Sequence, residues 1–343
     1  MAMNRIQFQA GLSLPEFIQL YGTEEKCEAA LEQARWPDGF RCPRCECKEY
    51  GLIHGRRHKR YQCRSCRHQA TLTAGTILEA TKLPLTTWFL AFYLVGQAKT
   101  GISSLALRRH LGVNYRTAWL VHNKIMQAMK ERDGAYVLRG KVQVDDAYLG
   151  GERCGGKTGR GSENKVPIVA AVSLDDAGHP RHVKLATVAT FSFAAIADWA
   201  QDSLAIGCEV ISDGLACFRA VAEVGCFHHP VVVKGRHPNE LPEFRWINTV
   251  LSNLKTSFSG TFHALKFDKY ADRYLGAFNY RFNRRFNLAT MTERVVHAIC
   301  SCDARPERIL RSAELTNKDR SCVATILSGG WTSPLSLLTR GLR

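Results

Sequence analysis

Two pairs of cysteines constrain this chain more than any other feature of its sequence. Cys42 and Cys45 form one Cys-x-x-Cys pair, and Cys63 and Cys66 form a second pair after seventeen intervening residues. Each pair suits a tight knuckle, and a hairpin between them brings the knuckles together, so that four thiolates can surround one tetrahedral Zn²⁺. The spacing therefore predicts a structural zinc ribbon that holds one Zn²⁺ per chain.

The charge of the chain indicates a polyanionic partner. The formal net charge is +16, and basic residues flank the cysteine pairs in RCPRC, GRRHKRYQC and RSCRHQ. A zinc ribbon in a positive field favours nucleic acid over a membrane, and a merely basic enzyme is the alternative. The odd count of 13 cysteines does not suit a disulfide framework, and no signal peptide or apolar window of about 20 residues is visible. We therefore expect a cytoplasmic, nucleoid-associated protein with reduced thiols.

The first part of the chain is expected to be helical around the ribbon. Apolar periodicity predicts a helical segment over 1–37, the ribbon over 38–74, and further helices over 75–135. A short helix from about Ser104 to Gly112, followed by a longer one, reads as a helix-turn-helix, although a plain helical hairpin remains open. In the DNA-binding interpretation, the recognition helix begins at Asn114, Tyr115 and Arg116.

The second part of the chain predicts an α/β domain over 136–300. Strands are expected in KVQVDDAYLGG, PIVAAVSLDD, HVKLATVAT, EVISDG and VVVKG, and SFAAIADWAQDSLA is expected to be helical. Strands interleaved with helices favour an α/β sheet with flanking helices. Residues 301–343 form a tail to which the sequence assigns no role.

Three aspartates stand at the ends of two expected strands. Asp145 and Asp146 end one strand, and Asp213 ends another. Carboxylates held at neighbouring strand ends can bind Mg²⁺ or Mn²⁺, and a pair of such ions supports phosphoryl transfer. Loop capping is the ordinary alternative for such aspartates.

A helical segment sharpens the case for a metal site. In RWINTVLSNLKTSF, Asn248, Ser252 and Lys255 fall on one face at about 100° per residue, whereas Val250, Leu251, Leu254 and Phe258 take the buried side. The amide of Asn248 is a candidate metal ligand, and the ammonium of Lys255 a candidate phosphate contact. A solvated helix face is the alternative.

Several of these motifs, in this order and spacing, resemble one known family. CPRC…CRSC, TAGTILEATKLPLTTWFLAFYL, VDDAYLGG, SDG, WINTVLSNLKTSFSGTFH and RYLGAFNYRFNRRF are together similar to bacterial insertion-sequence transposases with a zinc ribbon and a ribonuclease H-like catalytic domain. The resemblance runs from about residue 15 to about residue 300. It implies a ribonuclease H-like mixed sheet preceded by a zinc ribbon and a helix-turn-helix.

The resemblance also implies roles for individual residues. It gives Asp145 and Asp213 as magnesium ligands and catalytic carboxylates, with Asn248 in the place of the usual glutamate and Lys255 as the associated lysine. Relatives have Asp-Glu where this chain has Asp145 and Asp146, so the two aspartates can exchange roles. His263 lies just beyond this helix, where a structural hydrogen bond is favoured over a substrate contact. Three arginines of RYLGAFNYRFNRRF are candidate contacts for DNA phosphates: Arg281, Arg284 and Arg285.

These inferences predict a DNA transposase. It would bind the terminal inverted repeats of its mobile element, free 3′-hydroxyls with two Mg²⁺ or Mn²⁺ ions, and join them to target DNA. Because transposition joins two ends, the resemblance implies a homodimer or a higher assembly on double-stranded DNA. A non-catalytic zinc-ribbon regulator and a metal-dependent nuclease without strand transfer are the alternatives.

Overall fold

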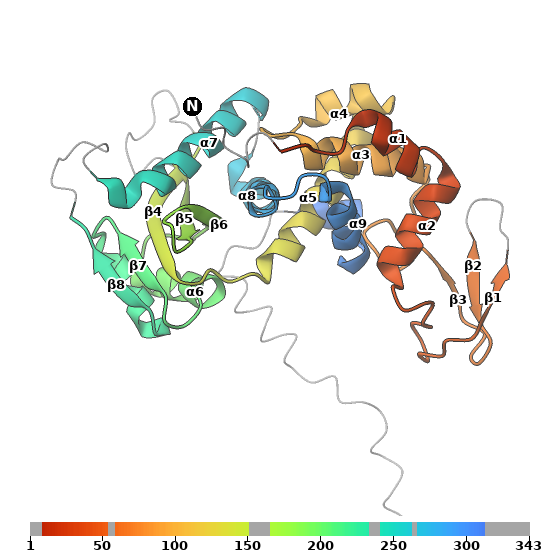
Figure 1. Cartoon of the computed structure of the whole chain (residues 1–343), viewed down its shortest axis with the longest axis horizontal. Helices are drawn as coiled ribbons and strands as arrows, with labels where there is room; N and C mark the ends of the chain where they lie inside the picture. The colour runs from red at the N-terminus through yellow and green to blue at the C-terminus, as the bar shows by residue number, and fades with distance from the viewer. Residues whose placement is uncertain (1–8, 54–58, 151–164, 233–240, 263–265, 313–343) are drawn as a thin grey trace, which may run out of the picture.

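The computed structural model of this protein describes residues 9–53, 59–150, 165–232, 241–262 and 266–312. These residues pack into two parts, each with its own hydrophobic core. One core is helical and joins the small ribbon sheet, and the other surrounds a five-stranded sheet. Figure 1 shows the ribbon at one end of the molecule, the large sheet at the other, and helices α5 and α8 between them. Among the described residues, no helix is long and apolar enough to cross a membrane.

The N-terminal helices and the ribbon form one side of the helical core. Helices α1 (Leu14–Tyr21) and α2 (Glu24–Arg35) precede the ribbon strands β1 (Tyr50–Ile53), β2 (Arg60–Cys63) and β3 (Gln69–Thr71). The three strands pair antiparallel in that order. Tyr61 of β2 is fully buried beside the rings of Trp36, Phe40 and Tyr50, so the ribbon packs on aromatic side chains as well as on its knuckles.

Helices from distant parts of the chain complete this core. They are α3 (Leu85–Gln97), α4 (Ser104–Leu111), α5 (Tyr115–Gly134), α9 (Met291–Ser301) and the short α10 (Glu307–Arg311). Phe89 of α3, Ile125 of α5 and Val295 of α9 are all fully buried in it. Helix α9 therefore packs with the N-terminal helices, although it lies in the range predicted for the α/β domain. The predicted domain boundaries themselves stay predictions.

The α/β half contains a mixed sheet between two layers of helices. Its strands are β4 (Lys141–Leu149), β5 (Val166–Leu174), β6 (Pro180–Thr187), β7 (Glu209–Ser212) and β8 (Phe227–Pro230), in the order β6-β5-β4-β7-β8. Strands β4, β5 and β6 pair antiparallel, whereas β7 and β8 run parallel to β4. The predicted α/β class with a mixed sheet and flanking helices is thus confirmed.

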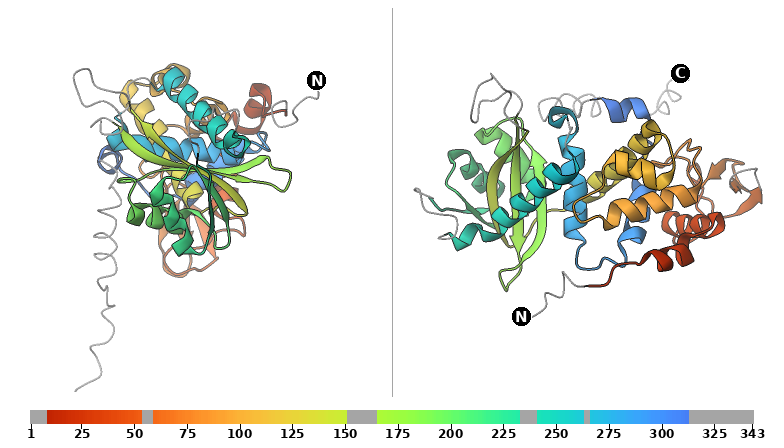
Figure 2. Two further views of the ribbon diagram at one scale, coloured as in Figure 1. Left: turned by 90° about the vertical axis from the view of Figure 1, so that its left-hand side faces the viewer. Right: turned by 90° about the horizontal axis from the view of Figure 1, so that it is seen from above.

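Alternating side chains of the strands supply the two buried faces of this sheet. One face packs under α6 (Phe193–Ser203) and the 3₁₀ helix η2 (Ala216–Val224). The other packs under α7 (Arg245–Thr261) and α8 (Phe267–Asn283), which follow the short η4 (Pro242–Phe244). Figure 2 shows the sheet edge-on between these layers. A strand buried on both faces reads as a continuous apolar run, and VPIVAAV in β5 has this pattern.

The fifth strand differs from the sequence prediction. We expected VVVKG, but the strand is Phe227–Pro230, directly before those valines. Its register against β7 runs from Glu209 opposite Phe227 to Ser212 opposite Pro230. Strand β7 ends at Ser212, whose carbonyl still accepts a hydrogen bond from the N–H of Val231 at 2.8 Å. The rest of the predicted segment from residue 233 onward lies outside the described residues. The length of β7, which is a tertiary property, therefore sets the end of the observed pairing more than the β propensity of Val231 and Val232 does.

Helix α8 covers the free edge of strand β6. Asn279 accepts a hydrogen bond from the N–H of Leu185 (3.1 Å) and donates to its carbonyl (3.0 Å), and Asn283 does the same with Val183 (2.7 and 3.0 Å). Four residues of helix rise about 6 Å and two residues of strand about 6.6 Å, so the two amides match the strand spacing. These contacts satisfy backbone N–H and carbonyl groups of β6 that no further strand pairs with, and they hold α8 against the edge of the sheet.

Candidate metal centres and DNA-contacting residues

The four ribbon cysteines converge as their spacing predicts. The Cys42 and Cys66 sulfurs lie 3.6 Å apart, those of Cys45 and Cys63 lie 3.5 Å apart, and all four lie within 4.8 Å of one another. A tetrahedral Zn²⁺ with Zn–S bonds of about 2.3 Å requires sulfurs about 3.8 Å apart. The donor set and its dimensions therefore fit one structural zinc ion.

The backbone of each knuckle prepares the thiolates. The carbonyl of Cys42 accepts from the N–H of Glu46 (2.9 Å), and that of Cys63 accepts from Arg67 (3.1 Å). Glu46 and Arg67 occupy the left-handed region at φ 58° and 60°, which closes each turn. Backbone N–H groups of Cys66 and Ser65 donate to the Cys63 sulfur and, against burial, lower the pKa of Cys63 to about 6. The lowered pKa of Cys63 favours the thiolate that binds metal, whereas at Cys45, against a hydrogen bond from a backbone N–H, hydrogen bonds with the neighbouring thiols raise the pKa to about 12.

A second cluster brings the three predicted aspartates together. Asp213 directly follows β7, as predicted, but Asp145 and Asp146 lie within β4, which continues to Leu149, so the prediction that they end a strand is wrong. The parallel register places Val144 opposite Ser212, so the aspartates follow at adjacent positions on neighbouring strands. Their carboxylate oxygens lie within 4.8 Å of one another. Oxygen ligands in this number suit Mg²⁺ or Mn²⁺.

Strand alternation separates the two neighbouring aspartates. Val144 packs in the core under α6, whereas Gln143 accepts a hydrogen bond from α7. Asp145 therefore shares the α7 side with Gln143, and Asp146 shares the other side with Val144. Both stay within the cluster, so the exchange of roles that the sequence left open stays open.

The electrostatics of the cluster suit a cation. Burial and then the charges of Asp146 and Asp213 raise the pKa of Asp145 from 3.8 to about 7, while Lys255 on α7 opposes this shift. The backbone N–H of Asp146 donates to Asp145 (2.9 Å), and that of Leu215 donates to Asp213 (3.0 Å), which orients both carboxylates. Carboxylates held this close repel one another unless protons or cations bind.

Helix α7 presents its polar stripe as predicted. Val250, Leu251, Leu254 and Phe258 are buried, whereas Asn248, Ser252 and Lys255 are exposed. Lys255, at one end of this stripe, lies close enough to the cluster for its charge to lower the pKa of Asp145. Sequence reasoning missed Gln143, whose side chain accepts from the N–H of Ile247 at 3.0 Å. A polar residue inside the apolar strand KVQV was the available signal.

The predicted recognition helix begins at the expected residue. Asn114 is the N-cap of α5 and accepts from the N–H of Thr117 at 2.8 Å, and Gly112 ends α4 in the left-handed conformation. Tyr115 is exposed, and the side chain of Arg116 is 75% exposed but pairs with Glu307 of α10 at 2.9 Å. No local pattern signals this ion pair, because Glu307 lies in the tail without an assigned role.

The three arginines at the end of α8, one in its last turn and two just after it, have different surroundings. Arg284 pairs with Asp133 at 2.8 Å and lies over the ring of Tyr280. Arg285 donates to backbone carbonyls of Phe282, Arg181 and Pro180. Burial lowers the pKa of Arg281 to about 10. These contacts give Arg284 and Arg285 roles within the fold, and DNA contact by any of the three stays a prediction. His263 lies outside the described residues.

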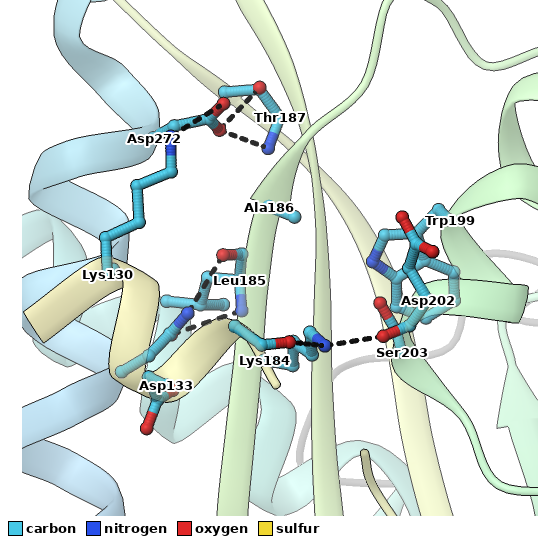
Figure 3. Close-up of a pocket in the computed structure, with 13 residues that line it drawn as sticks. Lys130, Asp133, Lys184, Leu185, Ala186, Thr187, Trp199, Asp202, Ser203 and Asp272 are labelled. Carbon is cyan, nitrogen blue, oxygen red and sulfur yellow. Dashed lines mark hydrogen bonds and ion pairs between the residues drawn. The ribbon is translucent and has the colours of Figure 1, made fainter. Parts of the chain in front are cut away.

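A separate cavity of about 330 Å³ lies between α5, α8, α6 and the edge strand β6. Lys130 pairs with Asp272 at 3.8 Å, and Lys184 donates to the Asp202 carbonyl at 2.7 Å, so both lysines already have partners. Figure 3 shows these residues around the cavity. Trp199 also lines it, and within the described ranges its indole N–H finds no partner. The lining shares no residue with either metal cluster, and sequence reasoning did not find this cavity.

The structure defines a zinc-ribbon protein whose α/β domain carries a candidate cation site. Comparisons with known proteins identify both of these domains. Residues 137–283 match the ISXO2-like transposase domain, and residues 22–69 match the transposase zinc-ribbon domain. The chain therefore contains an ISXO2-like transposase domain and a transposase zinc-ribbon domain.

A curated relative agrees with this assignment. The chain is 29% identical over 238 residues to a protein described as an uncharacterized protein in transposable element ISH50 of Halobacterium salinarum. The match covers 64% of this chain and 76% of that protein. A zinc ribbon in a transposase implies DNA binding, and its four-cysteine cluster supports Zn²⁺ as the bound metal.

Proposed function

We propose that this transposase cuts and joins DNA strands with a ribonuclease H-like domain. The strand order β6-β5-β4-β7-β8, with three antiparallel strands followed by two parallel ones, supports this fold. The observation that carries the proposal is the group of three aspartates within 4.8 Å on two adjacent strands, under a helix whose lysine acts on one of them. This arrangement combines oxygen ligands with a positive group for a phosphate.

Each residue of the site would have a definite role. Asp145 and Asp213, with Asp146 beside them, would hold two Mg²⁺ or Mn²⁺ ions, and the amide oxygen of Asn248 would add a neutral ligand. Bound ions would polarise the scissile phosphate and lower the pKa of an attacking water or 3′-hydroxyl. The exposed ammonium of Lys255 would bind a phosphate oxygen near Asp145 and offset the charge that accumulates there.

DNA binding would use the ribbon and the α4–α5 pair. We propose that α4 and α5 form a helix-turn-helix whose second helix enters the major groove with Asn114, Tyr115 and Arg116 at its start. The exposed first turn of α5 supports this orientation. The terminal inverted repeats of the element would be the specific sites, and a homodimer or higher assembly would hold two ends together. Such a protein would act in the cytoplasm on nucleoid DNA.

The test is a reaction with a short DNA carrying candidate element ends, a target plasmid and Mg²⁺ or Mn²⁺. Strand-transfer products support the proposal. Cut ends alone would indicate a nuclease, and a shifted but intact DNA would indicate a regulator. Asp145→Ala and Asp213→Ala should abolish cleavage but retain end binding, whereas Asp198→Ala, on the exposed surface of α6, should leave cleavage intact. Cleavage that survives in Asp145→Ala but not in Asp146→Ala would move the first catalytic carboxylate by one residue.

A further inference from the structure

A buried amide connects the strand of the carboxylates to the helix of Asn248 and Lys255. Gln143 of β4 is only 3% exposed, and its neighbours Val142 and Val144 are fully buried. Its side-chain oxygen accepts a hydrogen bond from the N–H of Ile247 at 3.0 Å. An amide side chain is costly to bury unless it is hydrogen-bonded, so this contact fixes the orientation of the Gln143 side chain.

Helix α7 has no cap of its own at this end. Phe244 occupies the N-cap position, makes no side-chain capping bond, and is buried in the core beneath α7. Ile247 is the third residue of the helix, where an N-cap side chain would ordinarily accept the free N–H. Gln143 supplies that acceptor from a different element. The bond that satisfies the start of α7 therefore also attaches the helix to β4.

The position of this attachment relates it to the proposed site. Gln143 lies two residues before Asp145 on the same side of the strand, a separation of about 6.6 Å. Ile247 directly precedes Asn248, and Lys255 lies about 12 Å beyond Ile247 along the helix axis. At the other end of α7, Ser257 donates to the carbonyl of Thr100, in the loop before α4. Within the described part of the chain, the Gln143 bond therefore joins α7 to β4 beside Asn248 and two residues from Asp145.

We propose that Gln143 is a positioning residue for DNA strand cleavage. Its bond to Ile247 sets the register and rotation of α7 against β4, and so places Asn248 and Lys255 relative to Asp145 and Asp213. Gln143 touches neither DNA nor the reacting atoms. This inference rests on the proposed function, because it assigns the bond a consequence for strand cleavage.

The test compares three variants with the parent protein. Gln143→Leu removes the acceptor, and Gln143→Glu keeps a side-chain oxygen at the same reach. Asn279→Leu is the matched control, because it removes two hydrogen bonds between α8 and the edge strand β6, on an element that carries neither the three aspartates nor Asn248 and Lys255. Measurements are the rate of end cleavage, the DNA concentration at half-maximal rate, and amide hydrogen exchange of residues 245–254.

We expect Gln143→Leu to lower the maximal cleavage rate about 10- to 100-fold, because a misplacement of about 1 Å has effects of this size. The DNA concentration at half-maximal rate should stay unchanged, and exchange at the start of α7 should rise. Gln143→Glu should recover most of the rate and of the protection. Asn279→Leu, compared at temperatures equally far below each variant's unfolding midpoint, should keep the parental rate.

Three outcomes would overturn this inference. They are a parental rate in Gln143→Leu, an equal loss of rate in Asn279→Leu, and unchanged exchange at the start of α7 in Gln143→Leu. A parent protein without metal-dependent cleavage would instead refute the proposed function. In that case the exchange measurement still decides whether Gln143 holds the helix.

Discussion

Replacing Asp145 with asparagine should stabilise the protein when divalent cations other than the ribbon zinc are absent. Burial and two neighbouring carboxylates raise the pKa of Asp145 from 3.8 to about 7, so the folded state binds a proton that the unfolded state releases. The free energy of unfolding therefore falls as pH rises from about 4 to about 7, and the loss persists at higher pH. Asparagine removes this titration and keeps an oxygen that can accept from the N–H of Asp146.

The size of this effect follows from the shift. Each pKa unit corresponds to about 1.4 kcal/mol, so Asp145→Asn should gain about 4 kcal/mol at pH 8 and less than about 2 kcal/mol at pH 5. At about 1.5 °C per kcal/mol for a chain of this length, the melting temperature should rise by roughly 6 °C at pH 8. Asp198→Asn is the control, because Asp198 is exposed on α6, and this substitution should change the melting temperature little.

Thermal unfolding followed by circular dichroism, in buffer freed of Mg²⁺, measures this gain at both pH values. Adding millimolar Mg²⁺ should raise the melting temperature of the parent, because the ion binds only the folded carboxylate cluster. The same addition should have little effect on Asp145→Asn. A variant no more stable than the parent at pH 8, or a gain that does not shrink at pH 5, would refute the reasoning.

Further results are expected from variants at three other places in the molecule. Cys63→Ser should lose the ribbon zinc, as measured by metal analysis of the purified protein, and retained zinc would contradict the ribbon assignment. The variant should bind element ends more weakly while the α/β domain stays folded, because the two metal clusters lie in separate cores. Glu307→Gln should release Arg116 and tighten DNA binding, whereas Arg116→Ala should reduce the preference for element ends over random DNA in a salt-controlled binding assay. Asn248→Glu should lower the Mg²⁺ concentration needed for cleavage, because a carboxylate binds Mg²⁺ better than an amide. Asn248→Ala and Lys255→Ala should each lose most of the rate, and parental rates in both would leave the stripe a solvated helix face.

The sequence determined those features that depend on spacing along one element or one short loop. The cysteine spacing predicted a four-sulfur cluster, and the structure places those sulfurs within 4.8 Å of one another. Apolar periodicity predicted which side of α7 is buried, and the aspartates on two neighbouring strands predicted that Asp145, Asp146 and Asp213 would meet, although Asp145 and Asp146 lie within β4 and not at its end. The predictions for the cysteines and for α7 succeed because Cys-x-x-Cys turns and helix periodicity are properties of local geometry.

Only the tertiary structure decided which distant residues become partners. The fifth strand lies before the predicted valines because the length of β7 limits pairing. Arg284 meets Asp133, and Arg116 meets Glu307 from far along the chain, so two arginines predicted for DNA have protein partners. Gln143 became the cap of a helix about a hundred residues away because β4 and α7 pack together. Such contacts depend on how whole elements pack, and no local pattern in one sequence encodes the packing of elements so far apart.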